Sequence, residues 1–128
     1  MELEYDTFGS SSDPALLLIM GLATQMTGWD ERFCQQIADA GRFVIRFDNR
    51  DVGLSTKLDG QVADLAGART AAFADQPPAP LPYTLSDMAA DAIGRLDHLG
   101  SGKAHIVGAS LGGMIAQVVA VEHPQRVL

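Results

Sequence analysis

The segment Gly108-Ala109-Ser110-Leu111-Gly112 has the pattern G-x-S-x-G, and its neighbours decide the fold. A short apolar run precedes it at residues 104–107, and small and branched apolar residues follow it at 111–122. These patterns predict a buried strand before the serine and a helix after it. Ser110 is therefore expected at a sharp strand-to-helix turn, with its hydroxyl held above the end of a sheet.

The chemistry of this turn depends on its two glycines. A serine there must adopt a strained backbone conformation, which is tolerable only where Gly108 and Gly112 leave out their Cβ atoms. The amides at the start of the following helix then face the hydroxyl and can stabilise an oxyanion. The pattern thus predicts a nucleophile elbow with Ser110 as the nucleophile.

Other interpretations of the same region stay open. Ser110 can act simply as the N-cap of the helix. Residues 108–113 also approximate the dinucleotide-binding pattern G-x-G-x-x-G, although Ser110 stands where the middle glycine belongs and the later acidic residue is missing. Residues 100–103 resemble a phosphate-binding loop, but they precede a strand instead of following one.

Outward from the elbow, apolar periodicity predicts strands that alternate with helices. We expect strands at residues 2–8, 15–20, 43–47 and 104–107, the start of another at 127–128, and helices at 29–40, 83–99 and 111–122. An Ala-rich stretch at 62–74 predicts a further short helix, and Pro77, Pro78, Pro80 and Pro82 predict an extended connection. This order predicts an α/β fold, namely a doubly wound, mostly parallel sheet with helices on both faces.

The helix patterns also predict which side chains are buried. The inward face of helix 29–40 is expected to carry Phe33, Ile37 and Ala40. In helix 83–99 the side chains expected to face water are Asp87, Asp91 and Arg95, opposite an apolar stripe. Thr84 and Asp87 are spaced as a capping box, and helix 111–122 is so uniformly apolar that deep burial is expected.

Composition excludes several classes of protein. The 128 residues carry a net charge of -7 and no Lys/Arg cluster, which argues against a nucleic-acid partner. The single cysteine, Cys34, allows no internal disulfide and is expected to be a packed thiol. No metal-ligand spacing, membrane-spanning run or secretion signal is present in the sequence, so we predict no metal, no membrane partner and a cytoplasmic location.

Three stretches in this order resemble the N-terminal half of an α/β-hydrolase. They are residues 16–21 (Leu-Leu-Leu-Ile-Met-Gly), residues 47–55 (Phe-Asp-Asn-Arg-Asp-Val-Gly-Leu-Ser) and the elbow, with Trp29 between the first two. Within that superfamily the chain is most similar to small bacterial esterases of the aclacinomycin-methylesterase and non-haem haloperoxidase type. The resemblance implies that residues 1–128 form the N-terminal part of a single α/β-hydrolase domain, ending after the elbow helix, with the C-terminal part missing.

The resemblance also implies site residues. Ser110 would accept the acyl group of a small-molecule ester, and the backbone N–H groups of Leu111 and Leu22 would form the oxyanion hole, with no cofactor. Leu22 follows Gly21 in a loop where the family often has His-Gly and this chain has Met-Gly. The polar residues implied to brace the neighbouring turn through hydrogen bonds are Asp48, Arg50 and Ser55.

The acid and histidine of the family's triad follow the serine in the chain order Ser, Asp/Glu, His. Here only Glu122 and His123 follow, at the far end of a helix about 18 Å long. His98 and His105 are expected at the opposite edge of the sheet. We therefore predict a serine hydrolase whose triad acid and histidine are absent from this chain, so that residues 1–128 alone are inactive. A non-catalytic binding or interaction protein on the same fold is the alternative, with a dinucleotide-binding domain behind it.

Overall fold

The computed structural model describes residues 1–77 and 80–128, and its centre is a four-stranded sheet. The strands lie in the order β1-β3-β2-β4, with bounds β1 (Tyr5–Phe8), β2 (Ala15–Ile19), β3 (Phe43–Phe47) and β4 (Ala104–Gly108). β2 pairs in parallel with β3 and with β4, whereas β1 pairs antiparallel with β3. The sheet is thus mostly parallel, as predicted, with one antiparallel edge strand.

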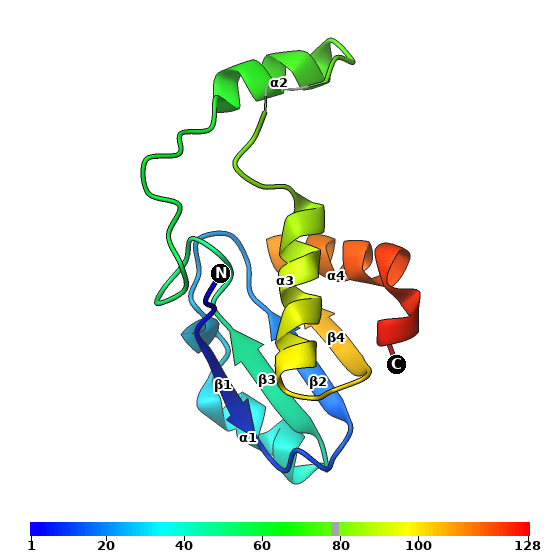
Figure 1. The fold of residues 1–128 in the computed structure, drawn as a ribbon. Helices are drawn as coiled ribbons and strands as arrows, with labels where there is room; N and C mark the ends of the chain where they lie inside the picture. The colour runs from blue at the N-terminus through cyan, green and yellow to red at the C-terminus, as the bar shows by residue number, and fades with distance from the viewer. Residues whose placement is uncertain (78–79) are drawn as a thin grey trace.

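Helices cover both faces of this sheet (Figure 1). α1 (Glu31–Asp39) packs on one face, and α3 (Leu85–His98) and α4 (Leu111–Glu122) pack on the other. Two short 3₁₀ helices, η1 (Met26–Gly28) and η2 (Pro124–Arg126), complete the body. The predicted doubly wound α/β arrangement is confirmed.

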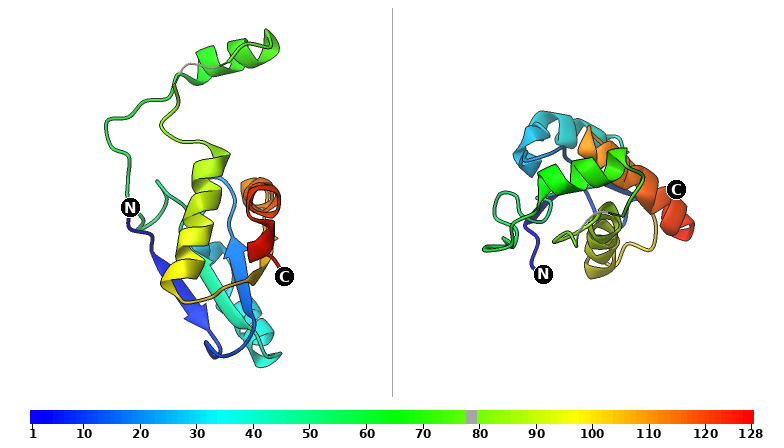
Figure 2. Two further views of the ribbon diagram at one scale, coloured as in Figure 1. Left: turned by 45° about the vertical axis from the view of Figure 1, so that its right-hand side comes forward. Right: turned by 90° about the horizontal axis from the view of Figure 1, so that it is seen from above.

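The predicted helix in the Ala-rich stretch is also present, as α2 (Leu65–Phe73). It stands clear of the body, beyond the end of the sheet at which β2, β3 and β4 finish (Figure 2). The prediction of extended chain at Pro78 falls outside the described residues.

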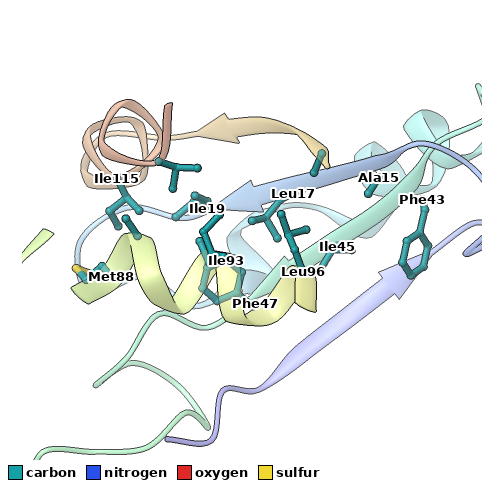
Figure 3. Packing of buried hydrophobic residues seen from close by; sticks show 14 residues of the cluster. Ala15, Leu17, Ile19, Phe43, Ile45, Phe47, Met88, Ile93, Leu96 and Ile115 are labelled. Carbon is teal, nitrogen blue, oxygen red and sulfur yellow. The ribbon is translucent and has the colours of Figure 1, made fainter. Parts of the chain in front are cut away.

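Alternate residues of the central strands point to opposite faces and build two cores. On the side of α3 and α4, Leu17, Ile19 and Ile45 meet Leu96 and other apolar side chains of the two helices (Figure 3). On the side of α1, Leu18 and Val44 pack against that helix. β2 and β3 are buried on both faces, in keeping with their nearly continuous apolar sequence; the exception is Arg46 in β3, whose guanidinium donates to the Trp29 carbonyl and the Asp6 carboxylate.

Of the three residues of the α1 region expected to face inward, only Ile37 packs, partly buried, against this core, and Ala40 is exposed. Cys34 and Ala38 are buried against β2 and β3, whereas Phe33 is exposed and stacks on Trp29, with 5.8 Å between the ring centroids. The prediction that Phe33 points inward is wrong. Phe33 instead lies at the surface, where the ring of Trp29 covers part of it. Cys34 is packed as predicted, and its burial raises the pKa of the thiol.

α3 begins and packs as its sequence predicts. Thr84 Oγ1 accepts the Asp87 N–H, and the Asp87 carboxylate accepts the Thr84 N–H, which completes the capping box. The Thr84 hydroxyl also donates to the Asp87 carboxylate at 2.7 Å, and this bond, together with the one from the Thr84 N–H, lowers the pKa of Asp87. The buried residues of the apolar stripe are Met88, Ala89, Ala92, Ile93 and Leu96.

Two polar residues of α3 do not face water, and these predictions are wrong. Arg95 is only 8% exposed, because its guanidinium donates to the Leu3 carbonyl and lies over the ring of Tyr5 at 4.1 Å. Burial lowers the pKa of Arg95. Asp91 forms a two-pronged ion pair with Arg50, at 2.6 and 2.8 Å.

α4 is less buried than predicted. Its buried residues are Gly112, Ile115 and Val119, whereas Met114 is 55% and Val121 79% exposed. The described residues therefore cover only part of this helix, although its sequence is apolar on all sides.

At the outer edge of β4, Val127 bridges Ala104 in parallel, and the Leu128 N–H donates to the Ala104 carbonyl at 3.0 Å, where the start of a strand was predicted.

The ion pair between Arg50 and Asp91 offers a test of how the turn after β3 is held to α3. Both side chains are largely buried, so Asp91→Ala leaves an unpaired cation and should lower the free energy of unfolding by about 2 kcal/mol in urea titrations. Arg32→Ala removes only the exposed ion pair with Asp30 and should leave the free energy of unfolding nearly unchanged. Equal losses in the two variants would contradict a buried anchoring role for Asp91.

Candidate active site

Ser110 lies at the turn between β4 and α4 and has an unusual backbone conformation. Its φ is 52° and its ψ is -117°, a region that residues with a Cβ rarely occupy. The residue is exposed, and its side chain makes no capping hydrogen bond to α4. The interpretation of Ser110 as a simple side-chain N-cap is therefore not supported.

The two glycines of the pattern make this turn possible. A Cβ at Gly108 would collide with the backbone of Gly112 and Gly113, because α4 starts directly over the end of β4. A Cβ at Gly112 would collide with the carbonyl groups of Ile19 and Met20. The first turn of α4 is thus pressed against the ends of two neighbouring strands.

The loop that follows β2 lies beside Ser110. The Ala109 N–H donates to the Ile19 carbonyl at 3.0 Å, which continues the pairing of β2 and β4 past the end of β4. A Cβ built on Gly21 would lie 3.3 Å from the Ala109 carbonyl oxygen and 3.9 Å from Ser110 Oγ. Within the described residues, the N–H groups of Leu22 and Leu111 have no protein acceptor.

Two of the three residues predicted to brace the turn after β3, Asp48 and Ser55, hold it through hydrogen bonds. The Asp48 carboxylate accepts the N–H groups of Met26 and Leu54, at 2.7 and 2.9 Å. Ser55 Oγ donates to the Asp48 carbonyl at 2.7 Å and accepts the Glu4 N–H at 2.9 Å. Arg50 instead reaches across to Asp91 of α3, so it ties the turn to the helix and not to itself.

Asn49 is a functional candidate that the sequence alone did not single out. Its amide Nδ2 donates to the Met20 carbonyl at 2.9 Å in a buried hydrogen bond. The only sequence signal was a polar residue directly after a buried strand, beside the predicted Asp48. Asn49 thus links the end of β3 to the residue before Gly21.

The histidines and late acidic residues lie away from this turn. His98 ends α3 and packs edge-on against Tyr5, and His105 lies near the start of β4, about 16 Å of strand before Ser110. Glu122 ends α4, where it accepts a hydrogen bond from Ser86 at 2.7 Å.

In the described ranges, no cluster of three His, Cys, Asp or Glu side chains is placed to hold a metal ion. No helix in that part of the chain combines the length and the apolar character needed to cross a membrane.

A mostly parallel sheet with a strained serine where one strand turns into a covering helix defines an α/β protein of the hydrolase class. A family model described as alpha/beta hydrolase fold matches residues 14–128. Rhodomycin D methylesterase from Streptomyces peucetius is 37% identical over 120 residues, covering 94% of this chain and 34% of the esterase. The 3-oxoadipate enol-lactonase 2 of Acinetobacter baylyi is 32% identical over 126 residues, covering 97% and 38%. A crystal structure of a hydrolase from Pseudomonas aeruginosa superposes with a TM-score of 0.73 at 30% identity, covering 98% and 38%.

The chain belongs to the α/β-hydrolase family. The predicted resemblance to bacterial methylesterases is confirmed by the relative from Streptomyces peucetius. The chain spans about a third of the length of the curated relatives it matches.

Two helical glycines provide a matched test of the close packing beneath Ser110. Gly112→Ala places a Cβ against two strand carbonyls and should lower the free energy of unfolding by about 3 kcal/mol or more. In Gly94→Ala the new Cβ meets no atom within 4 Å, so this change in α3 should raise stability by about 0.5 to 1 kcal/mol. Denaturant titration of both variants measures the difference. A tolerated Gly112→Ala would mean that α4 does not pack this closely on β2.

Proposed function

We propose that residues 1–128 supply the nucleophile and the oxyanion-binding N–H groups of a serine hydrolase that acts on carboxylic esters. The observation that carries this proposal is the conformation of Ser110, which holds an exposed hydroxyl at the carboxyl end of β4 without a capping role. Such strain persists only where the surrounding structure enforces it, and it collects at functional sites.

In the proposed reaction, Ser110 Oγ attacks the ester carbonyl carbon while a histidine base takes its proton. The carbonyl oxygen becomes an oxyanion, and the C–O bond to the alcohol breaks as the histidine returns the proton to the leaving oxygen. Water then adds to the acyl-enzyme by the same route and releases the acid. In this proposal the base and its acid partner come from outside these residues, because His98 ends α3, His105 lies near the start of β4, and His123 follows the far end of α4, about 18 Å of helix from Ser110.

The oxyanion is bound by backbone groups in this proposal. The Leu111 N–H lies at the first turn of α4, where the helix dipole also favours negative charge. The Leu22 N–H comes from the loop beside Ser110, and both N–H groups lack a protein acceptor among the described residues. Free donors fixed before the reaction stabilise a developing charge without reorganisation.

The substrate class is proposed from the relatives. A methylesterase and an enol-lactonase each open the C–O bond of a carboxylic ester, in one case acyclic and in the other cyclic. A small-molecule ester or lactone is therefore the substrate that we propose for the protein that contains this chain. A cytoplasmic location and the lack of nucleic-acid and membrane partners stay predictions from the sequence.

The role of Ser110 is tested with the complete coding sequence that contains these 128 codons. Ser110→Ala should lower kcat for a chromogenic short-chain ester by a factor of about 10⁴ or more, because the acyl-enzyme cannot form. Ser11→Ala, in the exposed turn after β1, is the matched control and should leave kcat unchanged. A fluorophosphonate should phosphonylate Ser110 with release of fluoride, so that the peptide containing Ser110 gains the mass of the phosphonyl group.

The outcomes separate enzyme from binding protein. A folded protein that neither hydrolyses esters nor reacts with the fluorophosphonate would favour the non-catalytic alternative. Residues 1–128 expressed alone should not turn over esters, because no described histidine reaches Ser110. Turnover by this piece that disappears in Ser110→Ala would overturn the assignment of the base to residues outside it.

A further inference from the structure

Two polar residues at the end of β3 are almost completely buried, although neither is part of the proposed chemistry. Asp48 and Asn49 are each 3% exposed. Burying polar side chains costs free energy unless hydrogen bonds replace those made to water. The partner of Asn49 and one of the two partners of Asp48 lie in the segment after β2, which carries the proposed oxyanion donor of Leu22.

Asn49 holds the start of this loop. Its Nδ2 donates to the Met20 carbonyl at 2.9 Å, with both residues buried. A peptide unit is planar, so fixing the Met20 carbonyl fixes the plane of the Met20–Gly21 peptide. The Leu22 N–H belongs to the next peptide unit along the chain.

Asp48 holds the end of the same loop. One carboxylate oxygen accepts the Met26 N–H at 2.7 Å, and the other accepts the Leu54 N–H at 2.9 Å. The carboxylate fits there because Gly53, at φ 53°, has no Cβ to collide with it. Consecutive residues of one strand end therefore anchor both ends of the loop from residue 20 to residue 26.

Between these anchors the hydrogen bonds of the loop are local, from the Thr24 N–H to the Gly21 carbonyl and from Thr24 Oγ1 to the Leu22 carbonyl. Leu22 is 75% exposed, and Ala23 is held at φ 52°, in the left-handed region. A cavity of about 640 Å³ separates residues 23–28 of the loop from the turn at residues 51–53. Across this space the Asp48 carboxylate connects the two sides, because it accepts the N–H groups of both Met26 and Leu54.

We propose that Asp48 and Asn49 are positioning residues, which hold the loop of residues 20–26 so that the Leu22 N–H faces Ser110. Only one part of this inference rests on the proposed function, namely that the Leu22 N–H binds the oxyanion. On the other side, α4 presses on the same loop where Gly112 meets the Met20 carbonyl. The loop is thus fixed between α4 and the end of β3.

The order of the loop can be measured in the 128-residue chain without any activity. Asn49→Leu keeps the approximate size of the side chain but removes the donor, so the heteronuclear ¹⁵N NOE of Leu22 and Ala23 should fall clearly below that of the unmodified chain. Asp48→Asn can accept only one of its two N–H groups, and amide exchange at Met26 should quicken about tenfold. Asn49→Gln keeps an amide donor and should restore part of the NOE.

Ile93→Val is the control, because it removes a methylene from the core under α3 and lowers stability without touching the loop. Its Leu22 NOE should equal that of the unmodified chain. If Asn49→Leu leaves the NOE unchanged, or if Ile93→Val lowers it equally, the proposal is overturned. If Asn49→Leu does not fold, the exchange rate of Met26 in Asp48→Asn decides in the same way.

An activity measurement in the complete protein separates this proposal from the proposed function. Asn49→Leu should lower kcat on the order of 10- to 100-fold with little change in KM, because a displaced donor weakens binding of the oxyanion more than binding of the ester. Loss of loop order with full kcat would refute the role of Leu22 as a donor. Full activity in Ser110→Ala would refute the proposed function and leave the loop measurement valid.

Discussion

The packing of α4 on the end of β2 is the contact on which the rest of this structure depends. Gly112 approaches the carbonyl groups of Ile19 and Met20 so closely that no Cβ fits between them. Because α4 starts there, β4 must turn into the helix within two residues, Ala109 and Ser110, and Ser110 takes the strained conformation. Strain of this kind costs about 1 to 3 kcal/mol, and the burial of Ile115 and Val119 beneath the helix offsets it.

Features set by neighbours in the sequence were predictable. The continuous apolar runs of β2 and β3 indicated strands buried on both faces, and Thr84 with Asp87 indicated where α3 begins. The spacing of Gly108 and Gly112 around Ser110 indicated a turn that side chains could not enter. In each case the residues that act together lie within a few positions of one another.

Features set by distant partners were not predictable. Arg95 looks like a surface residue of an amphipathic helix until the Leu3 carbonyl, 92 positions away, supplies its acceptor. Asp91 likewise meets Arg50 only across 41 positions. Helical periodicity separates polar from apolar residues, but it does not show which charged side chains become buried beside a partner when the chain folds. For α4, the uniform apolar pattern gives no face a preference, and burial then depends on what packs around the helix.

A backbone N–H donor leaves no signal in the identity of its own side chain, so sequence patterns do not reveal it. The proposed donors at Leu22 and Leu111 are main-chain N–H groups, and the exposed side chain of Leu22 contributes nothing to the donor. Any residue except proline keeps an N–H at that position. What a substitution can change is the direction of the N–H, and that direction depends on side chains that bond the backbone from another strand. In the proposed site, the direction of the Leu22 N–H therefore depends on Asp48 and Asn49, two side chains that are almost completely buried.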